Sequence, residues 1–201
     1  QKQQKPGGKG RFALSPSGPY KACTYVTLSL EFVVGEEGLV EGGRIKFGLP
    51  NMGWSEPRVP YIRGDYDLYP PEQRQVCRFW RSNTDWRVES SNDVSVRIYS
   101  RGSQNLIGPY VNWSWWITVV VEKGELDPGD TVTVIYGDTS MGEEGAYVQP
   151  WIEKDRVCFT AFSDSEGTGE FIQAEGSPVI CEVIPGPFTR ANLTVPSVSE
   201  S

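Results

Sequence analysis

Residues 26–34 read Val-Thr-Leu-Ser-Leu-Glu-Phe-Val-Val, and apolar side chains alternate there with Thr27, Ser29 and Glu31. A period of two places neighbouring side chains on opposite faces of an extended strand, so this stretch predicts a half-buried β-strand. Further strands are predicted at residues 44–49, 94–98, 113–122, 131–136, 146–152, 157–162, 170–174, 179–184 and 191–195. Glycine and proline, 22 and 15 of the 201 residues, punctuate these runs as turns do between short strands. The sequence therefore predicts an all-β fold, a single β-sandwich of nine or ten strands with an immunoglobulin-like or jelly-roll-like form.

The first 20 residues differ in composition from the rest. They are rich in Gln, Lys, Gly and Pro, so we expect a flexible N-terminal arm over residues 1–20 and the sandwich over residues 21–201. Inside the arm, Phe12 and Leu14 alternate with smaller neighbours in a strand-like pattern. A free sheet edge accepts an extended segment of another chain, and a head-to-tail contact of this kind gives a filament. The residues predicted to be donated are Arg11, Phe12, Ala13, Leu14 and Ser15; a disordered terminus is the alternative.

Histidine is absent from the chain. Its absence excludes histidine as a general base, the Ser-His and Cys-His nucleophile pairs, and imidazole-based metal sites. Nineteen basic residues against 26 acidic ones give a formal net charge of −7, which disfavours contact with a nucleic-acid backbone. The most apolar run, residues 113–121, is too short to span a membrane as a helix. We therefore expect a protein that is not an enzyme, needs no cofactor, binds no nucleic acid and has no membrane span.

The four cysteines are Cys23, Cys77, Cys158 and Cys181, an even set without the close spacing of structural zinc sites. We interpret them as two disulfides, which are typical of secreted domains. Three pairings are open. Cys158–Cys181 is favoured because its flanking strands are close in sequence, and this leaves Cys23 for Cys77. Four buried free thiols are the alternative.

Two Asn-x-Ser/Thr triplets, at Asn112 and Asn192, are candidate glycosylation sites. Together with the even cysteine count and an opening at Gln1 rather than Met, they predict a secreted, extracellular or cell-surface glycoprotein in its mature form. In a chain of bacterial source, the triplets would carry no information about glycosylation.

Asp164, Glu166 and Glu170 lie beside two glycines within seven residues. Oxygen ligands on a glycine-bent loop are the kind that wraps calcium. The loop lacks the distal bidentate glutamate of a full calcium loop, so an acidic hairpin turn is the alternative.

Trp113 and Trp115 share one face of a predicted strand. Flat aromatic rings stack on sugar faces, so the pair is a candidate carbohydrate platform. Apolar residues follow on the same strand, and packing of the two rings in the core is the alternative.

Several short motifs follow one another in order between residues 25 and 197. They are Gly-Gly-Arg-Ile-Lys-Phe-Gly-Leu-Pro at 42–50, Gly-Trp-Ser at 53–55, Pro-Gly-Asp at 128–130, Ile-Tyr-Gly-Asp at 135–138, Val-Gln-Pro at 148–150, Asp164 with Gly167, Gly169 and Phe171, Val-Ile-Pro-Gly at 183–186, and Leu-Thr-Val-Pro-Ser at 193–197. Their order resembles the β-sandwich region that precedes the catalytic part in a bacterial family of unknown function. That catalytic part is similar to metal-dependent phosphoesterases of the polymerase-and-histidinol-phosphatase (PHP) type, and the resemblance implies that it would begin just after residue 197. Because its metal ligands are rich in histidine and this chain has none, no catalytic residue is carried over.

Two interpretations follow. The first is a non-catalytic, extracellular structural protein, a β-sandwich subunit that assembles with copies of itself into a filament or fibril by strand addition of its arm. The alternative is an accessory module, separated from a larger metal-dependent hydrolase and binding carbohydrate. A glycosidase with paired carboxylates is disfavoured, because no two acids can be placed facing each other.

Overall fold

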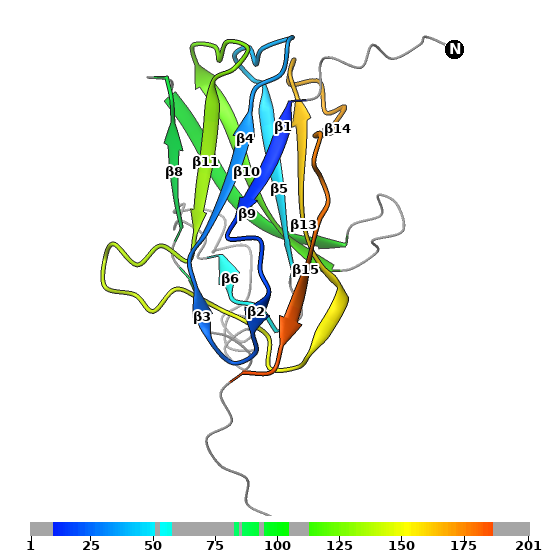
Figure 1. Cartoon of the computed structure of the whole chain (residues 1–201). Coiled ribbons are helices and arrows are strands. Elements are labelled where there is room, and N and C mark those ends of the chain that lie inside the picture. Colours follow the sequence, from blue (N-terminus) through cyan, green and yellow to red (C-terminus); the bar gives the residue numbers. More distant parts are fainter. Residues whose placement is uncertain are drawn as a thin grey trace, which may run out of the picture.

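The computed structural model describes residues 10–50, 53–57, 83–84, 86–92, 95–104 and 113–186. This part of the chain contains strands and turns and no helix, and hence no apolar helix of membrane-spanning length. Two main sheets pack against each other (Figure 1). The prediction of an all-β sandwich is confirmed.

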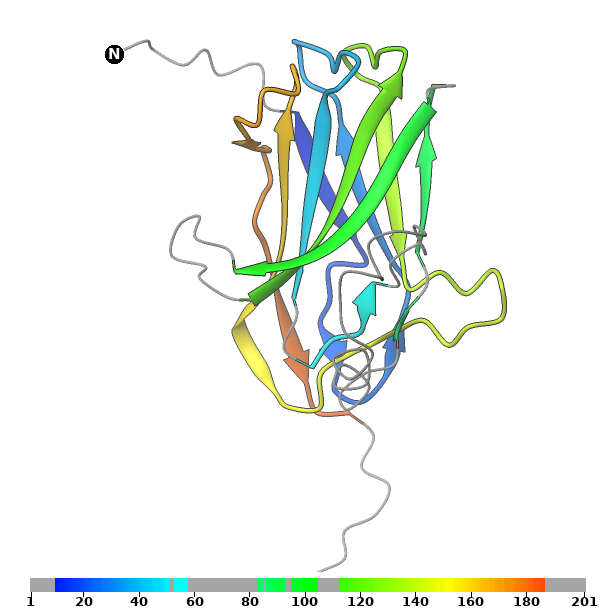
Figure 2. The same cartoon turned by 180° about the vertical axis from the view of Figure 1, so that it is seen from behind.

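The first sheet has four strands in the order β1-β4-β11-β8. Their bounds are Arg11–Ser15 for β1, Leu28–Val33 for β4, Thr131–Tyr136 for β11 and Trp86–Ser90 for β8. The second sheet has the order β2-β15-β13-β5-β10-β9, with β14 paired to β13 as a seventh strand. Their bounds are Tyr20–Lys21 for β2, Val179–Ile184 for β15, Glu153–Asp164 for β13, Arg44–Pro50 for β5, Trp113–Lys123 for β10, Ser95–Gln104 for β9 and Ile172–Gln173 for β14. From behind, the long green strands β9 and β10 run diagonally across this sheet (Figure 2).

Two short ladders complete the described strands. They are β3 (Tyr25–Val26) with β12 (Ala146–Tyr147), and β6 (Glu56–Pro57) with β7 (Asn83–Thr84). Both consist of two residues on each side, and of these four strands β6 and β7 were not predicted from the sequence.

The core lies between the two main sheets and is built from the alternating apolar residues. Inward-facing side chains of β4 and β11 oppose those of β5, β10 and β13. The buried set is Leu28, Leu30, Phe32, Val132, Val134, Tyr136, Ile45, Phe47, Leu49, Ile117, Val119, Val121, Val157 and Phe159. Burying each large side chain contributes roughly 1.5–3 kcal/mol, so the alternation fixes which face of each strand turns inward.

The long strands lie where the alternation predicts them. The run at residues 26–34 is nevertheless broken at Thr27, whose hydroxyl donates to the carbonyl of Gly137 over 2.7 Å. The run at 146–152 forms strand only at Ala146–Tyr147, and the run at 170–174 only at Ile172–Gln173. The predicted strand at 191–195 lies outside the described residues.

The expectation of an arm over residues 1–20 is wrong for residues 10–20. Residues 11–15 form β1, which pairs with β4 of the same chain, and the side chains of Phe12 and Leu14 are only 3% and 8% exposed. The physical reason is that two apolar side chains at alternate positions gain more free energy in the core than in solvent. The sandwich therefore includes the chain from Gly10 onward, and residues 1–9 lie outside the described residues.

The expected disulfide between Cys158 and Cys181 does not form, and all three described cysteines are free thiols. The register pairs Val157 with Cys181 and Cys158 with Ile180. Because adjacent strand residues face opposite sides, Cys181 points into the core and Cys158 points away from it. Cys23 is an exposed thiol, and its expected partner, Cys77, lies outside the described residues.

Candidate functional site

The insertion site of β1 is the candidate functional site, and we call it the β1 slot. It is bounded by β4 on one side and by residues 173–177 on the other. On the β4 side, β1 is antiparallel from the pair Arg11–Val33 to the pair Ser15–Ser29. Among the described strands, β1 is the first in the chain and lies at the end of its sheet, so its removal would not interrupt the path of the other described strands.

The second side of the slot provides hydrogen bonds as well. The amide of Phe12 donates to the carbonyl of Glu175 over 2.8 Å, and the amide of Glu175 donates to the carbonyl of Gly10 over 2.9 Å. Ala174 in turn donates from its amide to the carbonyl of Ala161 in β13, over 3.0 Å. β1 thus bridges the first sheet to a segment that is attached to the second sheet, and it leaves no open strand edge at this position.

The side chains of β1 divide into two sets. Phe12 and Leu14 point into the core, where the ring of Phe12 lies 6.2 Å from that of Phe47 between centroids. Arg11, Ala13 and Ser15 are exposed. This division predicts that the inward pair supplies most of the binding free energy and that the outward positions tolerate change.

Two glycines allow the backbone of β1 to approach its neighbours closely. At Gly10, which has a φ of +62°, an added Cβ would overlap the ring of Phe32 and lie 2.7 Å from the carbonyl oxygen of Val33. At Gly176, which has a φ of +78°, an added Cβ would lie 2.6 Å from the carbonyl oxygen of Phe12. Both positions therefore exclude side chains by space and by backbone conformation.

A hinge at residues 16–19 connects β1 to the rest of the chain. Pro16, Ser17 and Pro19 are exposed, and the hinge carries the chain from the first sheet to β2 in the second. Its far end is fixed by Tyr20, whose ring contacts Trp54 and Phe159 edge-on and whose hydroxyl donates to the carbonyl of Pro16 over 2.5 Å. Burial raises the pKa of the Tyr20 hydroxyl well above its usual range, so this donor stays protonated.

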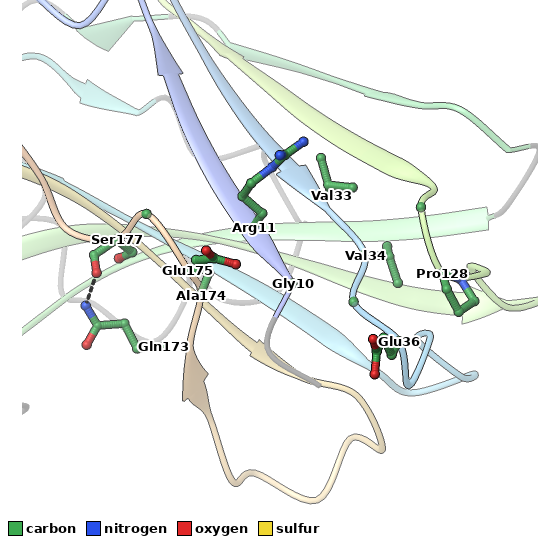
Figure 3. Close-up of a pocket in the computed structure, with 13 residues that line it drawn as sticks. Gly10, Arg11, Val33, Val34, Glu36, Pro128, Gln173, Ala174, Glu175 and Ser177 are labelled. Carbon is green, nitrogen blue, oxygen red and sulfur yellow. Dashed lines mark hydrogen bonds between the residues drawn. The ribbon is translucent and has the colours of Figure 1, made fainter. Parts of the chain in front are cut away.

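A cavity of about 820 Å³ continues the β1 slot beyond Gly10 (Figure 3). Its walls come from the end of β4 and the turn that follows, from residues 128–129 and from residues 173–177. Three charged side chains line it, Arg11, Glu36 and Glu175. The cavity lies beside Gly10 and Arg11, at the start of β1, and two of these three charges are negative.

Sequence reasoning identified β1 but missed the rest of the β1 slot. Gly176 is one of 22 glycines, and nothing in the sequence distinguishes it. Tyr20 carries no local signal either, because its partners Trp54 and Phe159 are distant in sequence. The positive φ of Gly176 and the ring contacts of Tyr20 are known only from the three-dimensional arrangement of the strands.

The expected sugar platform on β10 stays a prediction, because only one of its two tryptophan side chains is described. Trp115 is half-buried and packs against the core, and the side chain of Trp113 lies outside the described residues. The neighbouring Trp116, on the opposite face, is buried against Phe162, with the Lys46 ammonium 4.4 Å from the centre of its ring. Burial beside these rings lowers the pKa of Lys46.

The loop proposed for calcium is a turn closed by its own aspartate. The Asp164 carboxylate accepts hydrogen bonds from the amide of Thr168 over 2.9 Å and from the amide of Gly169 over 2.8 Å. Glu166 and Glu170 are exposed, and the described residues include no group of three or more acidic or cysteine side chains that could hold a metal ion. The geometry is that of the acidic hairpin turn, with Asp164 organising the loop.

Both candidate glycosylation sites, Asn112 and Asn192, lie outside the described residues. No known family model matches the chain, and none of the curated proteins is similar to it in sequence. The resemblance to the sandwich region of a PHP-associated family therefore stays a prediction. In the described residues, the extended strand β1 lies in a slot between β4 and residues 173–177 of the same chain.

Proposed function

We propose that the protein is a non-catalytic, extracellular structural subunit that assembles into filaments by exchanging β1 between neighbouring copies. In the closed monomer, β1 occupies the slot of its own chain. In the assembly, β1 of one subunit occupies the slot of the next. Because each subunit donates one strand and accepts another, the contact is head-to-tail and propagates.

The observation that carries the proposal is the way β1 is held. It is hydrogen-bonded to β4 and to Glu175, and it places Phe12 and Leu14 in the core. Within the described part of the chain, the hinge is its one covalent link to the sandwich. Exchange would preserve every one of these contacts, because the neighbour offers an identical slot. The free-energy difference between the closed and exchanged forms then depends on the hinge and on protein concentration.

The length of the segment is sufficient for exchange. β1 and the hinge together comprise residues 11–19, which span roughly 30 Å when extended. Tyr20 anchors the hinge to the donor through the contacts of its ring with Trp54 and Phe159. The donor sandwich can therefore stay intact while its first strand reaches a neighbour.

The other parts of the proposal rest on the sequence. A chain without histidine lacks the commonest side chain for acid-base and metal chemistry at neutral pH, which supports a structural rather than catalytic role. The extracellular setting rests on the triplets at Asn112 and Asn192. Mass spectrometry of the native protein tests it, because a glycan mass on either asparagine supports secretion.

A pair of engineered cysteines tests the exchange. Ala13 and Glu31 are exposed and lie opposite each other in the β1–β4 register, so the double variant Ala13→Cys/Glu31→Cys forms a disulfide across β1 and β4. Oxidation of the assembled protein should give a covalent ladder on a non-reducing denaturing gel. The matched control is Glu31→Cys/Thr133→Cys, whose register partners lie in the same subunit in either form and should give monomers only.

Two outcomes would overturn the proposal. One is assembled Ala13→Cys/Glu31→Cys protein that runs only as a covalent monomer, because β1 would then occupy its own slot. The other is the absence of filaments in electron micrographs at any protein concentration. The wild-type chain, oxidised in parallel, shows which crosslinks come from its native cysteines rather than from the engineered pair.

A further inference from the structure

The walls of the β1 slot impose a sequence requirement on any strand that enters it. Position 10 meets the ring of Phe32 and the carbonyl of Val33, so only glycine fits there. Position 12 fills a buried site beside Phe47, and position 14 fills a second buried site. Positions 11, 13 and 15 face outward and meet no such restriction.

The cavity adds a charge requirement ahead of the glycine. Glu36 and Glu175 line the cavity, and both side chains are exposed to solvent. Water and dissolved salt therefore screen their negative charges. The chain that precedes Gly10 carries Lys2, Lys5 and Lys9 and no acidic residue. The opposite charges are therefore complementary, with an effect that is small and sensitive to salt.

We infer that the β1 slot is a selective receptor for an extended segment of the pattern Gly-x-Phe-x-Leu preceded by lysines, and that its partner is the N-terminal segment of a second copy of this chain. The inference rests on the proposed exchange for the identity of the partner, whereas the selectivity follows from the slot alone. Glycine at position 10 acts as the specificity-determining residue. Phenylalanine and leucine supply the affinity, and the lysines favour this segment over neutral or acidic ones.

A cleavable hinge makes the selectivity measurable on the folded full-length protein. A protease site inserted after Ser17, in the exposed hinge, is cut after folding, so that β1 is held by non-covalent contacts alone. A fluorescent peptide of residues 5–15 is then exchanged into the slot at a urea concentration below the unfolding transition. Its affinity is measured by anisotropy and compared with that of variant peptides.

Variant peptides test separately the glycine at position 10, the buried apolar side chain at position 12 and the positive charge ahead of the glycine. Gly10→Ala should weaken binding at least about tenfold, because the methyl group and the backbone conformation are both unfavourable. Phe12→Ala should weaken it about a hundredfold through the loss of a buried ring. Lys9→Glu should weaken it about threefold at low salt and leave it unchanged in 1 M salt. The outward-facing Ala13→Ser is the control and should bind like the parent peptide.

A second measurement uses the uncut chain and needs no peptide. Gly176→Ala places a methyl group against the carbonyl of Phe12 and should accelerate hydrogen exchange of the β1 amides at least about tenfold. Gly42→Ala is the matched control, because Gly42 also has a positive φ, +89°, but has no atom within 4 Å of an added Cβ. It should leave β1 exchange at the wild-type rate.

Two outcomes would overturn the inference. One is equal affinity of the Gly10→Ala peptide and the parent peptide for the slot. The other is that the parent peptide does not bind the slot under conditions in which the cut β1 leaves it. These outcomes are distinct from a failure of the proposed function. If the peptides discriminate as expected while the cysteine pairs show no ladder, the receptor stands and self-assembly by exchange does not.

Discussion

Tyr20 joins the hinge to the core through a short chain of hydrogen bonds. The thiol of Cys181 in β15 lies 3.9 Å from the Tyr20 hydroxyl oxygen, and that hydroxyl donates to the carbonyl of Pro16. Burial raises the pKa of Cys181 to about 11. Both side chains are thus neutral at physiological pH, and their ionisation opposes the folded state.

The raised pKa of Cys181 predicts that the free energy of unfolding falls at alkaline pH. The Cys181 thiol of the unfolded chain ionises near pH 8.5, whereas the buried thiol stays protonated up to about pH 11. Its contribution to the free energy of unfolding is therefore complete below pH 8.5 and falls by roughly 3 kcal/mol as the pH rises to about 11. Urea unfolding between pH 7 and pH 11 should show this fall in the wild-type protein and a shallower one in Cys181→Ala.

Parallel profiles for the wild type and Cys181→Ala would contradict the assignment. Titration with a thiol reagent at pH 8 adds a second check, since Cys23 should react in the folded protein and Cys181 only after unfolding.

At the scale of elements, β1 differs from a normal edge strand in having partners on both sides. On its free side, Glu175 exchanges backbone hydrogen bonds with Gly10 and Phe12, and its inner face lies against the core. An unoccupied slot would therefore expose both a strand edge and apolar side chains. We therefore expect this strand of five residues to contribute to the stability of the fold.

The contribution of β1 can be measured by truncating its principal anchor. Phe12→Ala removes a buried ring and should lower the free energy of unfolding by about 3 kcal/mol. Chemical denaturation followed by tryptophan fluorescence measures the loss. Ala13→Ser alters the outward face of the same strand and should change stability by less than about 0.5 kcal/mol. A loss for Phe12→Ala no larger than that of its control would show that β1 is not bound in the slot.

Sequence reasoning recovered the elements that carry their own alternation, such as β4, β11 and the longer strands of the second sheet. β1 has only Phe12 and Leu14 as inward positions, and two apolar residues in a polar segment do not distinguish a free arm from an inserted strand. Cys158 and Cys181 show a similar limit. Their strands pair as expected, but a shift of one residue in the register decides whether the two sulfurs share a face.

At the scale of the whole molecule, the length of the hinge limits how β1 can reach its own slot, and changing that length tests the proposed exchange. Only four residues separate Ser15 in the first sheet from Tyr20 in the second, and Gly18 adopts a φ of +94° within this turn. Deleting Ser17 and Gly18 shortens the reach by roughly 7 Å, so β1 can no longer fold back onto its own chain. The deletion variant should shift from monomers to oligomers, as measured by size-exclusion chromatography with light scattering.

A lengthened hinge is the matched control. Inserting two Gly-Ser pairs after Ser17 should favour the monomer at the same protein concentration, because closure then occurs without strain. A deletion variant that remained monomeric with wild-type stability would contradict exchange through this hinge.

The sequence by itself determined the fold class, because the period-two alternation of apolar residues fixes which face of each strand is buried. It also shows that these 201 residues cannot supply an imidazole group, since they contain no histidine. Only the tertiary structure decided that β1 is inserted, that Gly10 and Gly176 form part of its slot, and that Cys158 and Cys181 face opposite sides. These features depend on register and on contacts between segments distant in sequence, such as Phe12 with Glu175 and Tyr20 with Cys181. Local patterns carry no information about such pairs.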